Sequence, residues 1–150
     1  MKPVWILTMV SSLIWAALGA SQQNPTAYVD FEKHDKLSSE KRRDLADSAR
    51  DVREKLRDRG IESTEDRDDA DVLVVILDRR IEVRPSGEND WGGALKQTHY
   101  QSRHILSVRY ETSATIEESE VALAGAFVTW KRVAGEVAKD AEKWARDHRP

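Results

Sequence analysis

The sequence predicts an α+β protein, with a mainly antiparallel sheet of three to five strands and two amphipathic helices packed on one face. Three observations support this fold class. Residues 70–84 contain the densest apolar run outside the amino-terminal segment, and residues 103–112 alternate between apolar and polar side chains, as a strand with one buried face does. Residues 38–59 and 129–147 instead repeat their apolar side chains at helical spacing.

The composition is that of one globular domain. The chain has 150 residues, of which 39% are hydrophobic and 34% charged, and its net charge is −3. This balance of charge gives no electrostatic reason to expect nucleic acid or an anionic membrane as a partner. Cysteine is absent, which excludes disulfides, thiolate metal sites and cysteine nucleophiles. We expect no cofactor and no metal site.

The amino-terminal residues 1–20 have the pattern of a secretory signal peptide. Lys2 precedes an apolar run from Val4 to Leu18, and small residues follow at Gly19 and Ala20. The run is shorter than the roughly 20 residues that a membrane span needs, so we expect cleavage within a residue or two of Gly19 and no membrane insertion afterwards. The sequence therefore predicts export to the periplasm or the extracellular space, with residues 21–25 as a linker and residues 26–150 as a single domain.

The first two elements after the linker are a strand and a helix. Residues 26–31 are β-branched and aromatic without helical spacing, and we expect this strand to pair with residues 70–84. In residues 38–59, one apolar stripe recurs at steps of three and four, Ser38 or Ser39 can cap the start, and Gly60 can end the helix in a left-handed conformation. The stripe consists of Leu45, Ala49, Val52 and Leu56.

The acidic residues 65–71 admit two interpretations. Closely spaced carboxylates are what a calcium ion requires, but the EF-hand pattern fails because Asp71 stands where glycine is needed and Leu77 where the last glutamate belongs. The alternative, which the mismatch favours, is an acidic turn before the strand.

We expect residues 70–84 to form the central strand. Both faces are apolar from Val72 to Leu77, and beyond it only Ile81 and Val83 remain apolar, on the parity of Leu77. The strand is therefore predicted to be buried on both faces at its start and on one face at its end.

Residues 85–100 are rich in turn-forming residues and are predicted to form a long connection. Trp91 in this loop is either a contact for a sugar, peptide or protein, or a lid folded back over the core. His99 and Tyr100 lie at the end of the same segment and are, with Trp91, the candidate binding residues.

The rest of the chain predicts strands and a helix. The apolar positions of residues 103–112 are His104, Leu106, Val108 and Tyr110, and this strand is expected to pair antiparallel with residues 70–84. Residues 120–125 are a weaker strand prediction. The second helix, residues 129–147, is expected to place an apolar stripe in the core. The stripe consists of Phe127, Trp130, Ala134, Val137, Ala141 and Trp144.

No catalytic motif is recognisable. The nearest arrangement is His99 with His104, which could bind a metal with Glu82 or Glu111 from a neighbouring strand. Five residues apart on a strand, however, the two histidines point to opposite faces unless a bulge intervenes.

The order of the elements resembles the small secreted modules of bacterial envelope proteins. The segments that resemble them are Tyr28-Val29-Asp30-Phe31, Ala70-Asp71-Val72-Leu73-Val74 and Leu106-Ser107-Val108-Arg109-Tyr110. The families are the amino-terminal domain of the TolB translocation protein and the periplasmic domain of the curli export lipoprotein. The resemblance implies an envelope location and a binding or assembly role.

Two hypotheses of function follow. The first is an exported, non-catalytic domain that binds an envelope protein or another envelope component through residues 85–100. The second is a small secreted hydrolase or metal-dependent enzyme that uses His99, His104 and strand carboxylates. The second requires these side chains to meet in one pocket, whereas the first does not.

Overall fold

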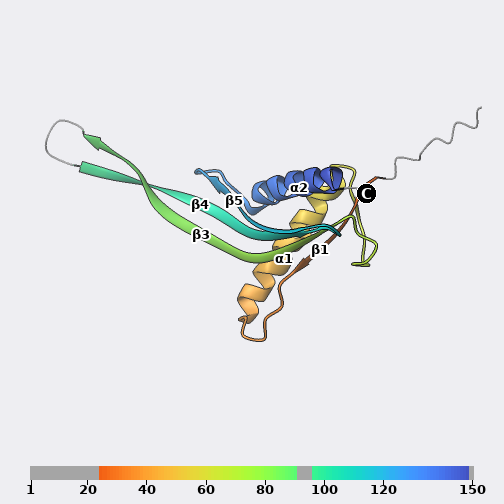
Figure 1. Ribbon diagram of the computed structural model, residues 1–150. Helices are drawn as coiled ribbons and strands as arrows, with labels where there is room; N and C mark the ends of the chain where they lie inside the picture. The colour runs from red at the N-terminus through yellow and green to blue at the C-terminus, as the bar shows by residue number, and fades with distance from the viewer. Residues whose placement is uncertain (1–23, 91–95, 149–150) are drawn as a thin grey trace, which may run out of the picture.

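The computed structural model describes residues 24–90 and 96–148 and shows a sheet covered by two helices (Figure 1). The predicted signal peptide, residues 1–20, and Trp91 lie outside the described residues. The elements in chain order are β1 (Thr26–Phe31), α1 (Ser39–Asp58), β2 (Glu62–Ser63), β3 (Val72–Asp90), β4 (Lys96–Glu111), β5 (Ile116–Ala124) and α2 (Trp130–Asp147).

The sheet has five strands in the order β2-β1-β3-β4-β5. β3, β4 and β5 are antiparallel neighbours, whereas β1 runs parallel to both β2 and β3. The parallel pair arises because α1 forms the crossover between β1 and β3, and a crossover returns the chain in the same direction. The α+β class and the pairing of residues 26–31 with the central strand are confirmed, and the sheet is mixed with an antiparallel majority.

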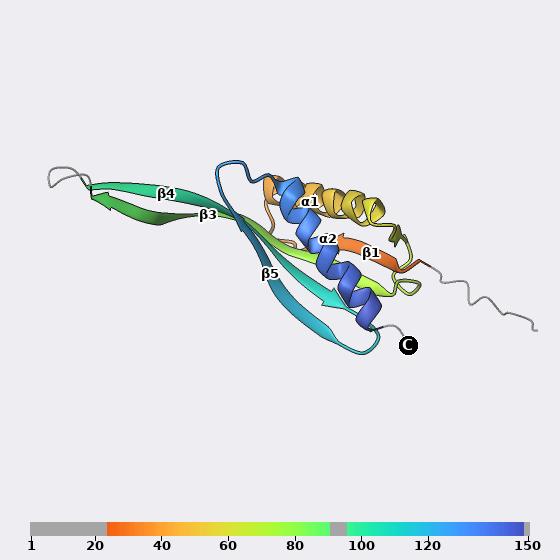
Figure 2. The same ribbon diagram turned by 90° about the horizontal axis from the view of Figure 1, so that it is seen from above.

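Both helices lie on one face of the sheet, as predicted (Figure 2). The α1 stripe from Leu45 to Leu56 is fully buried, and on α2 the buried stripe includes Val137 and Ala141. Trp130 and Trp144 pack at the margins of this core, half-buried. Phe127 was expected in the same stripe, but it precedes α2 and is 87% exposed. That part of the prediction is wrong, because the helical spacing does not extend into the connection before the helix.

The ends of α1 follow the predicted capping. The Ser38 hydroxyl accepts a hydrogen bond from the Lys41 backbone N–H at 3.1 Å. At the other end Gly60 has φ of +74°, and the Ile61 N–H donates to the Leu56 carbonyl at 3.0 Å. This arrangement satisfies the free carbonyls of the last turn and places Ile61 in the core.

β3 contains a β-bulge that the sequence pattern did not show. Ile76 pairs with Val108 and Asp78 with Ser107, so Leu77 is an extra residue with no counterpart on β4. After the bulge the alternation is reversed, and Ile81 and Val83 lie on the helix side of the sheet with Ile76 rather than on the side of Leu73. The predicted parity of these two residues is therefore wrong, because one inserted residue moves every later side chain to the other face.

The predicted loop of residues 85–100 is mostly strand. β3 continues to Asp90 and β4 begins at Lys96. A second register shift lies between Pro85 and Gly87, where Ser86 is the extra residue. Pro85, Ser86 and Gly87 are thus accommodated in a bulge, a position at which proline and glycine are tolerated in sheets. As a result β3 and β4 project beyond the helices as a long two-stranded ribbon (Figure 1).

Candidate functional site

The projecting ribbon is the feature of the fold that burial in the core does not explain. We call residues 81–90 and 96–104 the hairpin arm. β1 pairs with β3 only as far as Ile76, and β5 pairs with β4 no further than Arg103. Over most of the arm, each strand therefore has one neighbouring strand within the described residues. An isolated two-stranded ribbon is only marginally stable in water, so a long one needs a reason to be kept.

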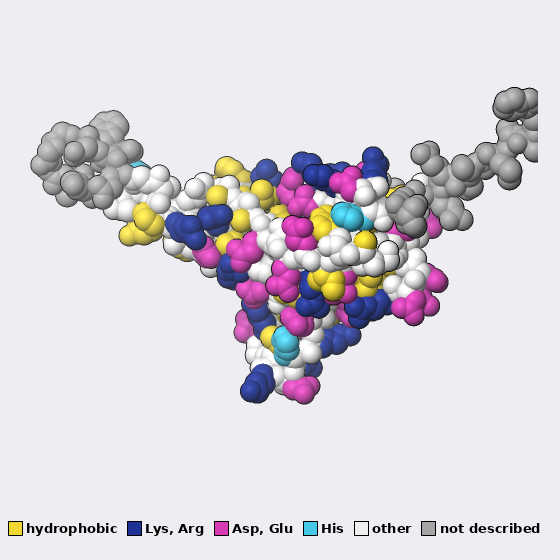
Figure 3. Space-filling model, viewed as in Figure 1, with side chains coloured by type: hydrophobic (Ala, Val, Ile, Leu, Met, Phe, Trp, Pro, Cys, Tyr) yellow, Lys and Arg dark blue, Asp and Glu magenta, His cyan; other side chains and the backbone are white. Residues whose placement is uncertain are grey.

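The helix-side face of the arm carries three exposed apolar side chains. Ile81 is 54% exposed, Val83 is 62% exposed, and Tyr100 is 70% exposed. These residues continue the row that supplies Val74 and Ile76 to the core, but the helices do not reach them. Figure 3 shows hydrophobic side chains on the surface where the arm leaves the body. Large apolar side chains grouped on a solvent-exposed face indicate an interaction site.

Phe127 adds a further exposed ring close to the base of the arm. The Gly125 N–H donates to the Ser102 carbonyl at 3.3 Å, and Ser102 pairs with Val83. The connection that carries Phe127 therefore starts beside the exposed residues of the arm. We call Ile81, Val83, Tyr100 and Phe127 the apolar strip.

The opposite face of the hairpin is charged and internally paired. Arg80 contacts Asp78, Glu82 and Glu120 at 3.3, 3.3 and 2.7 Å, and Arg84 contacts Glu82 at 2.8 Å. The hydrogen bond from Arg80 lowers the pKa of Glu82 against the smaller opposing effect of burial, and Arg84 lowers it further. Such exposed pairs contribute about 0–1 kcal/mol each, so this face is a solvated surface with its charges already paired.

Arg79 anchors the base of the arm to both helices. Its guanidinium donates to the Asp44 carbonyl at 3.0 Å and lies 4.3 Å from the centre of the Trp130 ring. His104 meets the same ring edge-on at 4.8 Å. These contacts hold the start of the arm in a fixed position relative to the helices, so its apolar face is presented in a defined direction.

The structure separates the histidines of the enzyme hypothesis. β4 pairs with β3 without an extra residue of its own, so His99 and His104 have opposite parity and point to opposite faces. His99 is exposed, whereas His104 packs against Trp130.

The carboxylates of that hypothesis are also engaged elsewhere. Glu82 is bound by Arg80 and Arg84, and Glu111 by Arg67 and Arg109 at 2.7 and 2.8 Å. Among the described residues no group of three or more potential ligands is arranged to hold a metal. The side chains that the enzyme hypothesis requires do not meet.

Of the predicted binding residues, Tyr100 belongs to the apolar strip, His99 lies on the other face of the same strand, and Trp91 is outside the described residues. The sequence analysis missed Ile81, Val83 and Phe127 as exposed residues. Their hydrophobicity made them core predictions. Ile81 and Val83 are exposed because the helices do not extend over this part of β3, and Phe127 is exposed because it lies in the connection before α2.

Comparison with known proteins gives structural likenesses but no sequence relative. No family model and no curated protein matches the chain. The crystal structure of rare lipoprotein B from Shewanella oneidensis is 10% identical with a TM-score of 0.49, covering 81% of this chain and 94% of that one. A minor lipoprotein from Acinetobacter baumannii is 12% identical with a TM-score of 0.44, covering 83% of this chain and 93% of that one.

At these values neither likeness assigns a family or a function to the chain. Neither protein is one of the two families named from the sequence, so that more specific resemblance is not confirmed. Across residues 24–90 and 96–148, no helix has the length and apolarity needed to cross a membrane.

Proposed function

We propose that the chain is an exported, non-catalytic binding domain that engages a partner protein through the apolar strip of its hairpin arm. The observation that supports this most is the continuation of one apolar row past the end of the helices. Val74 and Ile76 are fully buried, whereas Ile81 and Val83, on the same side of the same strand, are more than half exposed. A second protein on the arm would cover them as the helices cover the first two.

The type of contact follows from the shape of the arm. A ribbon with one apolar and one charged face can lie in an apolar groove while the charged face remains in water. Both edges of the outer ribbon also have backbone groups without a neighbouring strand among the described residues, and a partner's edge strand can pair with them. Export rests on the pattern of residues 1–20.

The proposal can be tested by photo-crosslinking in cells of the organism that makes the protein. A benzoylphenylalanine residue at Val83 or Tyr100 probes the apolar face. The matched control is the same residue at Arg84, the neighbour of Val83 on the opposite face. We expect one partner protein to be crosslinked from both apolar positions and not from Arg84.

A second variant links the crosslink to apolar contact. Ile81→Lys adds a charge to the strip at a residue that is already 54% exposed, so the melting temperature should change little while the Tyr100 crosslink is lost. Equal crosslinking from Val83 and Arg84, or none from either apolar position, would contradict the proposal. If the crosslinked product contained only two copies of this chain, the arm would bind a second copy of the protein and the proposal of a distinct partner would be wrong.

A further inference from the structure

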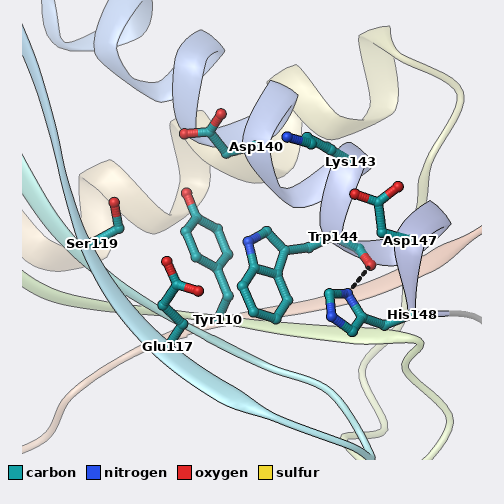
Figure 4. A pocket seen from close by; sticks show the side chains of 8 residues that line it. All are labelled: Tyr110, Glu117, Ser119, Asp140, Lys143, Trp144, Asp147 and His148. Atoms are coloured by element: carbon teal, nitrogen blue, oxygen red, sulfur yellow. Dashed lines mark hydrogen bonds between the residues drawn. The ribbon is translucent and has the colours of Figure 1, made fainter.

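A second opening in the molecule lies at the other end of the helix-covered face, away from the arm. It is a cavity of about 350 Å³ between the last turns of α2 and the helix side of β4 and β5 (Figure 4). Tyr110 and Glu117, which are paired across β4 and β5, form one wall, and Asp140 and Trp144 on α2 form the other. The sequence analysis placed Tyr110 and Trp144 in the core and did not identify the cavity.

Three stacked rings make this cavity a preformed site. Tyr110 and Trp144 are stacked with ring centres 5.9 Å apart, and Trp144 and His148 with centres 4.5 Å apart, both pairs within 12° of parallel. The His148 ring is held by a hydrogen bond between its Nδ1 and the Trp144 carbonyl at 3.1 Å. Rings fixed on a strand and a helix lose little conformational freedom when a ligand binds.

The hydroxyl of Tyr110 is an unmet hydrogen-bonding group at the cavity. Tyr110 is 1% exposed, and its hydroxyl has no hydrogen-bond partner among the described residues. Figure 4 shows this hydroxyl directed into the cavity toward the side of Asp140 and Ser119. Burial, with Asp140 and Glu117 adding to it, raises the pKa of Tyr110, so the hydroxyl remains neutral and keeps lone pairs available to a donor. Buried polar groups nearly always have a partner, and a bound ligand would supply one here.

The charge of the lining selects a cation. Glu117, Asp140 and Asp147 line the cavity, and within the described part of the chain their carboxylates make no hydrogen bond or ion pair. Burial and the nearby Glu136 raise the pKa of Asp140, and the charges of Lys139 and Lys143 offset this only in part. Lys143 is the one lysine or arginine among the lining residues. This contrasts with the charged face of the hairpin, where Asp78, Glu82 and Glu120 each contact Arg80.

We propose that this cavity binds a guanidinium group. The site offers carboxylate oxygens on two sides and a phenolic oxygen between them, all of which accept hydrogen bonds. A guanidinium supplies five N–H donors in one plane and carries its charge at every accessible pH. A metal ion fits less well, because no group of three ligands is arranged for one among the described residues. This site is independent of the apolar strip and of the function proposed for the arm.

The guanidinium can belong to a small free molecule or to an arginine side chain of a protein, and titrations separate these sources. The Trp144 indole N–H is followed by NMR while the protein is titrated with butylguanidine, with N-acetylarginine amide, and with N-acetylcitrulline amide as a neutral analogue of matched shape. The first two compounds each carry one positive charge. We expect saturable shifts with the first two and none with the third. Tighter binding of butylguanidine indicates a free ligand, and tighter binding of the arginine amide indicates a peptide.

Two pairs of variants distinguish a built site from general electrostatic attraction. Glu117→Gln and Glu118→Gln remove the same charge from adjacent residues of β5, but only Glu117 faces the cavity. We expect affinity to fall about tenfold with Glu117→Gln and to be unchanged with Glu118→Gln. Tyr110→Phe removes only a hydroxyl without a partner, so the protein should remain folded while affinity falls severalfold.

The results that would overturn the proposal are equally specific. They are shifts that do not saturate, equal shifts with the citrulline analogue, equal losses in both glutamine variants, or unchanged affinity in a folded Tyr110→Phe protein. Asp140→Asn provides a second test from the other wall and should also weaken binding by about tenfold.

Discussion

The two halves of the β3–β4 hairpin have similar helix-side residues in opposite surroundings. In the inner half, Val74, Leu106 and Val108 are buried beneath α1 and α2. In the outer half, Ile81, Val83 and Tyr100 occupy the equivalent positions without cover. The same chemistry therefore stabilises the fold in one half and, in our proposal, a complex in the other.

The difference between the halves comes from the lengths of the elements. α1 has 20 residues and α2 has 18, whereas β3 has 19 and β4 has 16. A strand advances about 3.3 Å per residue and a helix about 1.5 Å, so helices of this length cannot cover strands of this length. Part of the hairpin must project, and the bulge at Leu77 determines which side chains the projecting part shows on each face.

The largest difference between the halves is expected for truncation of an apolar side chain. Leu106→Ala removes a fully buried side chain and should lower the free energy of unfolding by about 2–5 kcal/mol. Val83→Ala, in the arm, should change it by no more than about 0.5 kcal/mol. Urea unfolding followed by circular dichroism measures both. A large loss for Val83→Ala would mean that the arm is covered by its own chain in solution.

An intermediate difference is expected for two arginines. Arg79→Ala removes the contacts with the Asp44 carbonyl and the Trp130 ring at a side chain that is largely buried, and should cost about 1–3 kcal/mol. Arg84→Ala removes an exposed contact with Glu82 and should change stability by less than about 1 kcal/mol. Arg79→Ala should therefore lower the free energy of unfolding more than Arg84→Ala does. The reverse order would mean that Arg79 does not anchor the arm.

Much of the covered half could be predicted from the sequence, because its signals are periodic and local. The stripe from Leu45 to Leu56, the cap at Ser38, and the alternation from Leu106 to Tyr110 each follow from spacing alone. These patterns repeat over several turns or strand residues, so a single atypical residue does not change the interpretation.

The arm and the cavity could not be predicted in the same way. The bulge at Leu77 moves the later side chains of β3 to the other face of the sheet, and the bulge at Ser86 lets the strand continue through a segment that was predicted to be a loop. A single-residue bulge leaves no periodic signal in the sequence. The cavity joins Tyr110 of β4 to Asp140 of α2, which are brought together only by packing. That the Tyr110 hydroxyl lacks a partner is likewise a property of the packed structure and not of the strand pattern.

The smallest expected effect compares two carboxylates at the two ends of the covered half. Asp78 lies at the base of the arm, where burial raises its pKa but the hydrogen bond and charge of Lys41, 2.6 Å away, outweigh this and leave the pKa lowered. Asp140 lies at the cavity, where burial raises its pKa. A lowered carboxyl pKa stabilises the fold above the unfolded-state pKa and loses this effect as the pH falls through the folded-state pKa. A raised pKa has the opposite sign and destabilises the fold once the group is ionised in both states.

Asp78→Asn should therefore lower the melting temperature at pH 7, and Asp140→Asn should raise it when no guanidinium compound is present. Both effects should correspond to at most about 1 kcal/mol, because both side chains are only partly buried. The Asp140→Asn effect should shrink as the pH falls through the raised folded-state pKa of Asp140 to the ordinary aspartate pKa. The Asp78→Asn effect should persist to that pH and shrink only below it, as the pH falls through the lowered folded-state pKa of Asp78. Thermal melts of the two variants and the parent protein across the acidic range measure this. If Asp140→Asn lowered the melting temperature at pH 7, its charge would be compensated in the free protein, and the cavity would lose the unpaired carboxylate on which guanidinium binding depends.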